Sequence, residues 1–273
     1  MSKVSQNPKA TRVALGVEYQ GSSYYGWQSQ PHESNTVQTW LEQALSKIAA
    51  VPVRIFCAGR TDAGVHGTGQ VIHFDSPEPR SLQAWVRGTN THLPHTIRVR
   101  WAKYVPDSFH ARFSAMARRY IYVIDNRPVR SAIMHQHFSF EDRPLDVKRM
   151  QQAAQYLVGE YDFSSYRTVK CQAKSPVKTV HHLRVQQRGT LISIDIKANA
   201  FLHHMVRNVA GVLMAVGMGK AEPIWAKEVL DARDRTVGGV TAPPQGLYLV
   251  EVDYPAEFEL PQTSVDLPFL MTE

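Results

Sequence analysis

The order of predicted secondary-structure elements constrains the fold of this chain more than any other feature of its sequence. Apolar residues recur every three or four positions over 36–50, which predicts a helix, and alternate with arginine over 97–105, which predicts a strand. Asn35 and Gln38 resemble a capping box at the start of that helix. The same patterns give the first half the order β-α-β-β-α-β, with strands at 12–19, 53–58, 69–75 and 97–105 and helices over 36–50 and near 80–91.

The second half repeats this order without repeating the sequence. It is predicted to contain strands at 118–125, 178–187, 191–198 and 246–253, helices over 146–158, 201–217 and 223–233, and an irregular stretch at 161–176. The order β-α-β-β-α-β is that of a ferredoxin-like unit. We therefore expect an α+β chain of two ferredoxin-like (RRM-like) halves, whose antiparallel sheets keep one face open for a ligand.

The chain divides into four parts on this basis. Its 273 residues suit one large domain or two of ordinary size. We expect a flexible N-terminus at 1–10, a first α+β half at 11–115, a second half at 116–254 and an acidic tail at 255–273. Hydrophobic residues make up 43% of the chain, which is enough for a packed core and excludes a disordered protein.

Positive charge is concentrated in the first half. The whole chain carries +7, but residues 1–135 hold 16 basic and 8 acidic side chains, whereas 251–273 hold six acidic and no basic ones. Most of the basic residues in the first half are arginine, which binds phosphate through paired hydrogen bonds and stacks on bases. This distribution favours a nucleic-acid partner, and a merely solvated basic surface is the alternative.

Several classes of protein are excluded by what the sequence lacks. No stretch reaches the roughly 18 apolar residues that span a bilayer, so no membrane segment is expected. No apolar signal segment precedes Glu18. The two cysteines, Cys57 and Cys171, are far apart in the sequence, which suits a reducing compartment better than a disulfide-bonded protein. We therefore expect a cytoplasmic protein.

The segment 58–67 is the first candidate for a functional site. It joins two predicted strands and contains three glycines, the guanidinium of Arg60 and the carboxylate of Asp62. Aspartate beside glycine is also common in ordinary turns, so a purely structural turn is the alternative.

Arg207 and Tyr120 are further candidates. Arg207 is the one charged residue between 198 and 219, in a predicted helix that is otherwise apolar. Such an arginine either reaches solvent or pairs with a carboxylate, because an unpaired buried charge is costly. Tyr120 follows two arginines in a predicted strand, where it is either a core residue or a ring on which a base stacks.

Other motifs are incomplete. The segment 217–220 (GMGK) lacks the first glycine and the final serine or threonine of a phosphate-binding loop. The pairs His181-His182 and His203-His204 lack a second ligand cluster at zinc spacing, so we interpret them as structural or RNA-facing and expect no metal site. Without a nucleotide loop or a metal cluster, a redox-neutral reaction that needs no ATP is favoured.

Several separated segments together resemble one family. They are 17–19, 25–28, 58–66, 109–113, 119–122, 162–166, 201–208 and 242–247. On these segments the chain resembles the TruA family of tRNA pseudouridine synthases (pseudouridine synthase I) over residues 11–254. The segment AGRTDAGVH at 58–66 is highly specific, and MVRN at 205–208 follows it in the expected order.

The resemblance implies a function and a set of partners. It implies isomerisation of uridine to pseudouridine at positions 38, 39 and 40 in the anticodon stem-loop of tRNA. It also implies a homodimer whose two subunits bind tRNA together, a central RNA-binding cleft, and a reaction with no cofactor and no metal.

The resemblance also assigns roles to individual residues. Asp62 is the catalytic carboxylate, and Arg207 is the cation expected beside it. Tyr120 stacks on the base and is a candidate proton acceptor at C5, and Leu247 forms an apolar wall of the pocket. Arg60 takes the place of the flipped base in the RNA stack. The implied RNA contacts are Phe109, His110, Ala111, Arg112, Phe113, Lys170, Cys171, Gln172, Ala173 and Lys174, and charge alone adds Arg80.

Other function classes stay open at this point. A non-catalytic RNA-binding or RNA-folding factor would use the same arginine-rich half and open sheets. Such a binder has no use for Asp62, because an acid inside a basic groove repels phosphate. Hydrolysis of a glycosidic bond is a weaker alternative, since it usually needs two carboxylates and the sequence shows no second one near Asp62. The isomerase is the preferred hypothesis.

Overall fold

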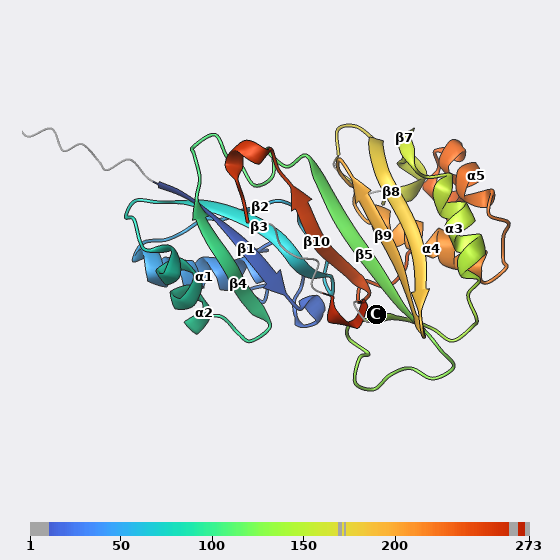
Figure 1. The fold of residues 1–273 in the computed structure, drawn as a ribbon, viewed down its shortest axis with the longest axis horizontal. Helices are drawn as coiled ribbons and strands as arrows, with labels where there is room; N and C mark the ends of the chain where they lie inside the picture. The colour runs from blue at the N-terminus through green and yellow to red at the C-terminus, as the bar shows by residue number, and fades with distance from the viewer. Residues whose placement is uncertain (1–10, 169–170, 172, 262–266, 271–273) are drawn as a thin grey trace, which may run out of the picture.

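One large sheet organises the molecule. The structure is a computed structural model that describes residues 11–168, 171, 173–261 and 267–270. Within these residues ten strands form a single sheet in the order β4-β1-β3-β10-β5-β9-β8-β7, with β2 on β3 and β6 on β5 (Figure 1). The strands are β1 (Thr11–Tyr19), β2 (Phe56–Cys57), β3 (His66–Ser76), β4 (Ile97–Tyr104), β5 (Ala117–Asn126), β6 (Ser139–Glu141), β7 (Gly159–Asp162), β8 (Val177–Arg188), β9 (Leu191–Ala198) and β10 (Leu247–Asp253).

The helices lie in two groups at the two ends of the sheet. One group is α1 (Val37–Ala49) and α2 (Thr89–Thr91), and the other is α3 (Val147–Gln155), α4 (Met205–Gly217) and α5 (Trp225–Ala232) (Figure 1). The apolar faces of α1, α3, α4 and α5 pack on the sheet, as the three-to-four-residue spacing predicted. Among the described residues, no helix combines the length and the apolar character that crossing a membrane requires.

The two halves share one sheet, whereas the sequence predicted a sheet for each half. They join where β10 runs parallel to β3, with Tyr248 opposite His66 and Leu249 opposite Gly67. This pairing satisfies backbone groups at the start of β3 that would otherwise form an exposed sheet edge. The junction lies directly after the segment 58–65, so it also fixes the position of that segment relative to the second half.

Strand β5 carries the core of the second half on both of its faces. Tyr120 and Tyr122 belong to the cluster that also contains the apolar face of α4, whereas Ile121 and Val123 belong to a cluster on the opposite face. Because successive side chains of a strand point to opposite faces, this alternation buries β5 between two layers. The strand is therefore a rigid support for any residue it carries.

Several element boundaries differ from the predictions. Helix α1 is capped by the side chain of Thr36, whose hydroxyl accepts a hydrogen bond from the Thr39 backbone nitrogen, and not by Asn35. The strand expected at 53–58 shortens to β2, and helix 201–217 begins only at Met205. The strands β6 and β7 were not predicted, because segments of three and four residues are too short to show an alternating pattern.

The acidic residues near the C-terminus partly neutralise the sheet. Asp253 pairs with Lys197 at 2.6 Å, and Glu251 pairs with Arg119 at 3.3 Å. Arg119 also binds Asp195 at 2.7 Å. The net positive charge of residues 1–135 therefore overstates the charge that is left for a partner, because Arg119 is already paired with acids of the second half.

We predict that burial of His66 makes the protein sensitive to mild acid. The ring is 1% exposed, its Nδ1 accepts a hydrogen bond from the Gly21 backbone nitrogen, and its Nε2 lies 3.0 Å from the Gln245 carbonyl oxygen. Burial lowers the pKa of His66 from 6.5 to about 4. The unfolded chain therefore binds a proton that the folded chain excludes, and stability present above pH 6.5 is lost as the pH falls toward 4. The loss from this group is about 3 kcal/mol.

Urea unfolding at pH 7.5 and pH 4.5 checks this prediction. The free energy of unfolding of the unmodified chain should fall between the two values, and His66→Gln should show a smaller fall. Some dependence should remain in the variant, because burial also lowers the pKa of His73 to about 4. An identical pH dependence in the two proteins would contradict the assignment to His66.

Candidate active site

The loop that carries Asp62 is fixed from several sides. The Trp27 backbone nitrogen donates to the Thr61 carbonyl oxygen at 3.0 Å, and the Val65 nitrogen donates to the Asp62 carbonyl oxygen at 3.1 Å. Gly64 has φ +81°, a conformation that a residue with a Cβ rarely adopts. The segment is thus a turn, as the structural alternative held, but its contacts hold the Asp62 side chain toward the second half of the chain.

Arg207 meets this carboxylate. Its Nη1 donates to Asp62 Oδ2 at 3.2 Å, and its Nε donates to the Ala242 carbonyl oxygen at 2.8 Å. The arginine side chain is 14% exposed. Of the two alternatives that the sequence left open, the structure therefore has Arg207 paired with a carboxylate rather than extended into solvent.

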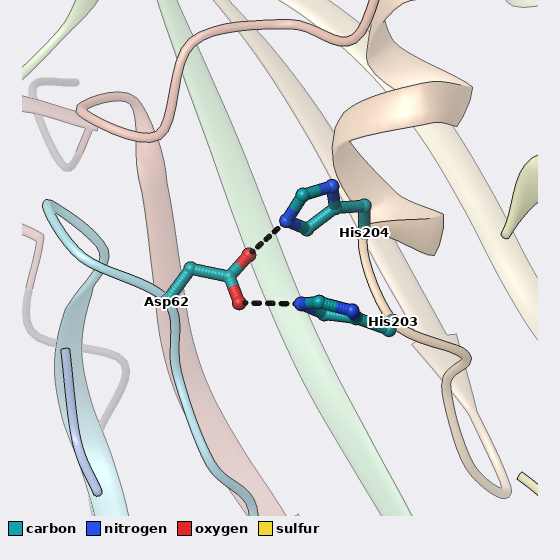
Figure 2. Close-up of side chains that lie close together, drawn as sticks. All are labelled: Asp62, His203 and His204. Carbon is teal, nitrogen blue, oxygen red and sulfur yellow. Dashed lines mark hydrogen bonds and ion pairs between the residues drawn. The ribbon is translucent and has the colours of Figure 1, made fainter. Parts of the chain in front are cut away.

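Two histidines that the sequence did not connect with Asp62 also lie against it. His203 Nε2 donates to Asp62 Oδ1 across 3.2 Å, and His204 Nε2 lies 3.2 Å from Asp62 Oδ2 (Figure 2). The interpretation of this pair as structural or RNA-facing missed the contact. In the predicted helix 201–217 they lie one turn before Arg207, which was a weak signal, since side chains three or four residues apart share a helix face; in the structure both precede α4.

The backbone of His204 explains why both rings reach the carboxylate. His204 precedes α4 with φ +64°, an uncommon conformation for a residue with a side chain. The rings of His203 and His204 consequently lie on the same side, with centroids 4.2 Å apart. This turn is also what delays the start of α4 to Met205.

The local electrostatics favour an anion at this point. Asp62 lies beside the guanidinium of Arg207 and close to the residues that begin α4, and the N-terminus of a helix carries partial positive charge. Burial lowers the pKa of His204; the charge of Asp62 raises it, and that of Arg207 lowers it again. The carboxylate is thus the one negative group in a small cluster of nitrogen atoms.

Tyr120 and Leu247 lie in the apolar cluster that adjoins the loop. The cluster includes Val65 of the loop itself, and Tyr120 and Leu247 are 8% and 6% exposed. The Tyr120 ring packs edge-on against Phe201, with centroids 5.0 Å apart. Burial raises the pKa of Tyr120, and the nearby charge of Asp62 raises it too. The structure therefore places an apolar aromatic wall next to the carboxylate.

The predicted RNA contacts divide into exposed and buried residues. Arg60, Arg80 and Arg112 are exposed, and Phe113 is 77% exposed with the guanidinium of Arg112 over its ring. In contrast, Phe109 and Ala111 are fully buried, so their side chains support the segment rather than contact RNA. His110 is half-buried and packs on Phe113.

The second predicted RNA segment is described only in part. Lys170 and Gln172 lie outside the described residues, and Ala173 and Lys174 are exposed. Cys171 is half-buried, and its Sγ accepts a hydrogen bond from the His203 backbone nitrogen at 3.4 Å. Cys171 is therefore adjacent to the Asp62 cluster.

Comparison with known proteins identifies the family. A sequence model described as tRNA pseudouridine synthase matches residues 16–114 and 153–255. The chain belongs to the tRNA pseudouridine synthase family. It is 60% identical over 260 residues to tRNA pseudouridine synthase A of Pseudomonas aeruginosa, covering 95% of this chain and 91% of that protein. It is 57% identical over 251 residues to the synthase of Alcanivorax borkumensis, covering 92% and 94%.

Likeness to solved structures is much weaker. A crystal structure of a Cbf5-Nop10-Gar1 complex matches with 14% identity and a TM-score of 0.32, covering 74% of this chain and 45% of that one. The chain therefore spans less than half the length of that structure, and a likeness of this size supports no argument.

Family membership decides between the function classes that the sequence left open. The members are isomerases that convert uridine in tRNA to pseudouridine, so the chain is an enzyme rather than a passive RNA binder. The reaction breaks the N1–C1′ bond and forms a C5–C1′ bond within one nucleotide.

Asp62, His203 and His204 are also the described residues whose donor atoms lie close enough together, within 4.8 Å, to hold a metal ion.

Proposed function

We propose that this chain converts uridine to pseudouridine at positions 38, 39 and 40 in the anticodon stem-loop of tRNA, with Asp62 as the catalytic carboxylate. The observation that carries the assignment of Asp62 is its ion pair with Arg207 at 3.2 Å, formed between two segments 145 residues apart. A loop that was only a turn would not need a cation from α4. The positions in tRNA follow from the resemblance to the TruA family.

The surrounding residues have distinct parts in this proposal. Asp62 supplies the electron pair that attacks C6 of uracil or acts at the sugar, and Arg207 holds the carboxylate in place. Leu247 and the ring of Tyr120 form the apolar walls between which the flipped uracil stacks. Because its pKa is raised, Tyr120 enters the reaction as a neutral phenol, which accepts a proton poorly. Its stacking role is therefore favoured over proton acceptance at C5.

The exposed basic and aromatic residues suit an RNA surface. Arg60 is exposed two residues before Asp62, so it is well placed to fill the gap that the flipped base leaves in the stack. Phe113 and Arg112 present a stacked aromatic and guanidinium pair, a combination that binds unpaired bases and phosphate. We propose that the half-buried His110 and the segment 170–174 complete this surface, with Arg80 as a more distant contact.

The architecture and assembly are also part of the proposal. Four strands of each half, β1-β2-β3-β4 and β5-β8-β9-β10, correspond to the predicted β-α-β-β-α-β order. The first of the four lies between the third and the fourth, as β4-β1-β3 and β10-β5-β9 show, which supports two ferredoxin-like halves at 11–115 and 116–254. We propose that the cleft between these halves binds RNA and that two copies of the chain bind one tRNA as a homodimer. The free thiols of Cys57 and Cys171 are consistent with work in the cytoplasm.

A substrate series tests the proposed tRNA positions. The purified chain is incubated with tRNA transcripts that carry tritium at C5 of uridine, and release of tritium is measured. Transcripts with uridine at positions 38, 39 or 40 should release tritium, and matched transcripts with cytidine at all three positions should release none. Undiminished release from the cytidine transcripts would overturn the proposed positions but would leave the family assignment intact.

A further inference from the structure

We propose that Asp62, His203 and His204 bind one divalent transition-metal ion such as Zn²⁺, and that the bound ion inhibits the reaction. Within the described part of the chain, the donor atoms of these residues lie within 4.8 Å of one another. Each imidazole Nε2 lies 3.2 Å from a carboxylate oxygen. Ligands bound tetrahedrally at zinc–nitrogen distances near 2.0 Å are separated by about 3.3 Å, so each nitrogen–oxygen contact already has the required spacing, and the widest pair of donor atoms must close from at most 4.8 Å.

The backbone prepares this arrangement before any ligand arrives. The left-handed conformation of His204, φ +64°, turns two consecutive rings to one side, where each faces a different oxygen of the Asp62 carboxylate (Figure 2). Strained backbone of this kind is costly and persists where the surrounding structure enforces it. The contact of His204 with Asp62 and the position of His203 at Thr168 and Cys171 supply that enforcement.

The site is open enough for an ion to enter. The side chains of Asp62, His203 and His204 are 28%, 43% and 27% exposed. The three protein ligands leave one position of a tetrahedron for water, which is the arrangement of an accessible zinc site rather than of a closed structural one.

The donor set selects the kind of metal. Two imidazoles and one carboxylate suit Zn²⁺, Co²⁺, Ni²⁺ or Cu²⁺, whereas Mg²⁺ prefers oxygen ligands and keeps its water. Arg207 already donates to Asp62 Oδ2, and metal-bound carboxylates commonly accept such an outer hydrogen bond. Its positive charge opposes a second cation, so binding depends on both histidines.

The consequence for activity rests on the proposed function of Asp62. A metal ion would take the electron pairs that the carboxylate needs and would occupy the space that the flipped uridine must enter. Zinc should therefore inhibit reversibly, and a chelator should restore turnover. The Mg²⁺ present with folded tRNA should not inhibit.

Metal binding is measured first without RNA, because tRNA phosphates bind cations themselves. The full chain, free of any histidine tag, is titrated with Co²⁺ and followed by visible absorption, and with Zn²⁺ by calorimetry. One equivalent should bind with visible bands of tetrahedral intensity. The variant His203→Gln/His204→Asn keeps polar side chains, and asparagine tolerates the left-handed backbone. It should bind at least about 10-fold more weakly, as metal sites do when even an outer partner is removed.

A matched control removes two imidazoles elsewhere. His32 and His92 are exposed surface residues, so His32→Ala/His92→Ala should bind Co²⁺ as the unmodified chain does. Failure to bind one equivalent, or equal affinity in the His203→Gln/His204→Asn variant, would overturn the proposed site. Inhibition of tritium release by Zn²⁺ is measured separately. Binding without inhibition would overturn the blocking role and count against Asp62 as the reacting group, while leaving the metal site established.

Discussion

The Asp62→Asn variant is expected to bind tRNA and to form no pseudouridine. The substitution keeps the shape of the side chain and leaves the loop contacts of Thr61 and Val65 in place. It removes the negative charge and the electron pair that the reaction needs. Loss of a reacting group of this kind lowers turnover by about 10⁴-fold or more. Tritium release from uridine-labelled tRNA measures the turnover, and filter binding measures the affinity.

A matched control separates the role of Asp62 from a general effect of charge. Asp231 lies on the surface of α5, where it pairs with Lys227, so Asp231→Asn removes an acid of the same type far along the chain. Its turnover should equal that of the unmodified chain. If Asp62→Asn released tritium at a rate close to that of the control, Asp62 would not be the catalytic carboxylate.

The Arg207→Ala variant is expected to lose both activity and stability. It leaves the half-buried carboxylate of Asp62 without its cation and the Ala242 carbonyl oxygen without its donor. Leaving such groups unpaired costs about 1–3 kcal/mol of the free energy of unfolding. Removing a preorganised partner of the reacting group lowers turnover by about 10²–10³-fold. Urea unfolding and single-turnover tritium release measure the two effects.

Arg207→Lys distinguishes charge from geometry. Lysine keeps a cation near Asp62, but it cannot donate to the carboxylate and to the Ala242 carbonyl oxygen through one planar group. We expect activity between that of the unmodified chain and that of Arg207→Ala. Full activity in Arg207→Ala would show that the ion pair has no part in the reaction.

The chemistry of the site was more predictable than its geometry. Asp62 and Arg207 were visible because each is chemically out of place: an acid in a glycine-rich loop among arginines, and a lone charge in an apolar helix. The need of a buried charge for a partner then predicted that they meet. His203 and His204 gave no such signal, because adjacent histidines are not out of place in either a structural or an RNA-facing segment. Only the tertiary structure shows the contacts of both rings with Asp62, to which the left-handed backbone of His204 turns them.

The same division holds for the RNA surface. The segment 109–113 was predicted as a whole, but the structure buries Phe109 and Ala111 and exposes Arg112 and Phe113. A sequence resemblance assigns a role to a segment, whereas burial depends on residues far away in the chain. Phe109, for example, packs against Phe258 and Tyr254, which lie near the C-terminus.

The sequence by itself predicted the main elements and their order, although not β6 and β7, and it singled out Asp62 and Arg207, the two groups that we propose the reaction requires. Hydrophobic periodicity and charge are local properties, so they can be recognised without a fold. The tertiary structure decided how the halves join, because the parallel pairing of β10 with β3 is formed by backbone groups that carry no sequence signal. That junction lies beside the Asp62 loop, and α4 of the other half supplies the cation and the two imidazoles. The site is therefore assembled by long-range backbone pairing, although its central residues are recognisable one at a time.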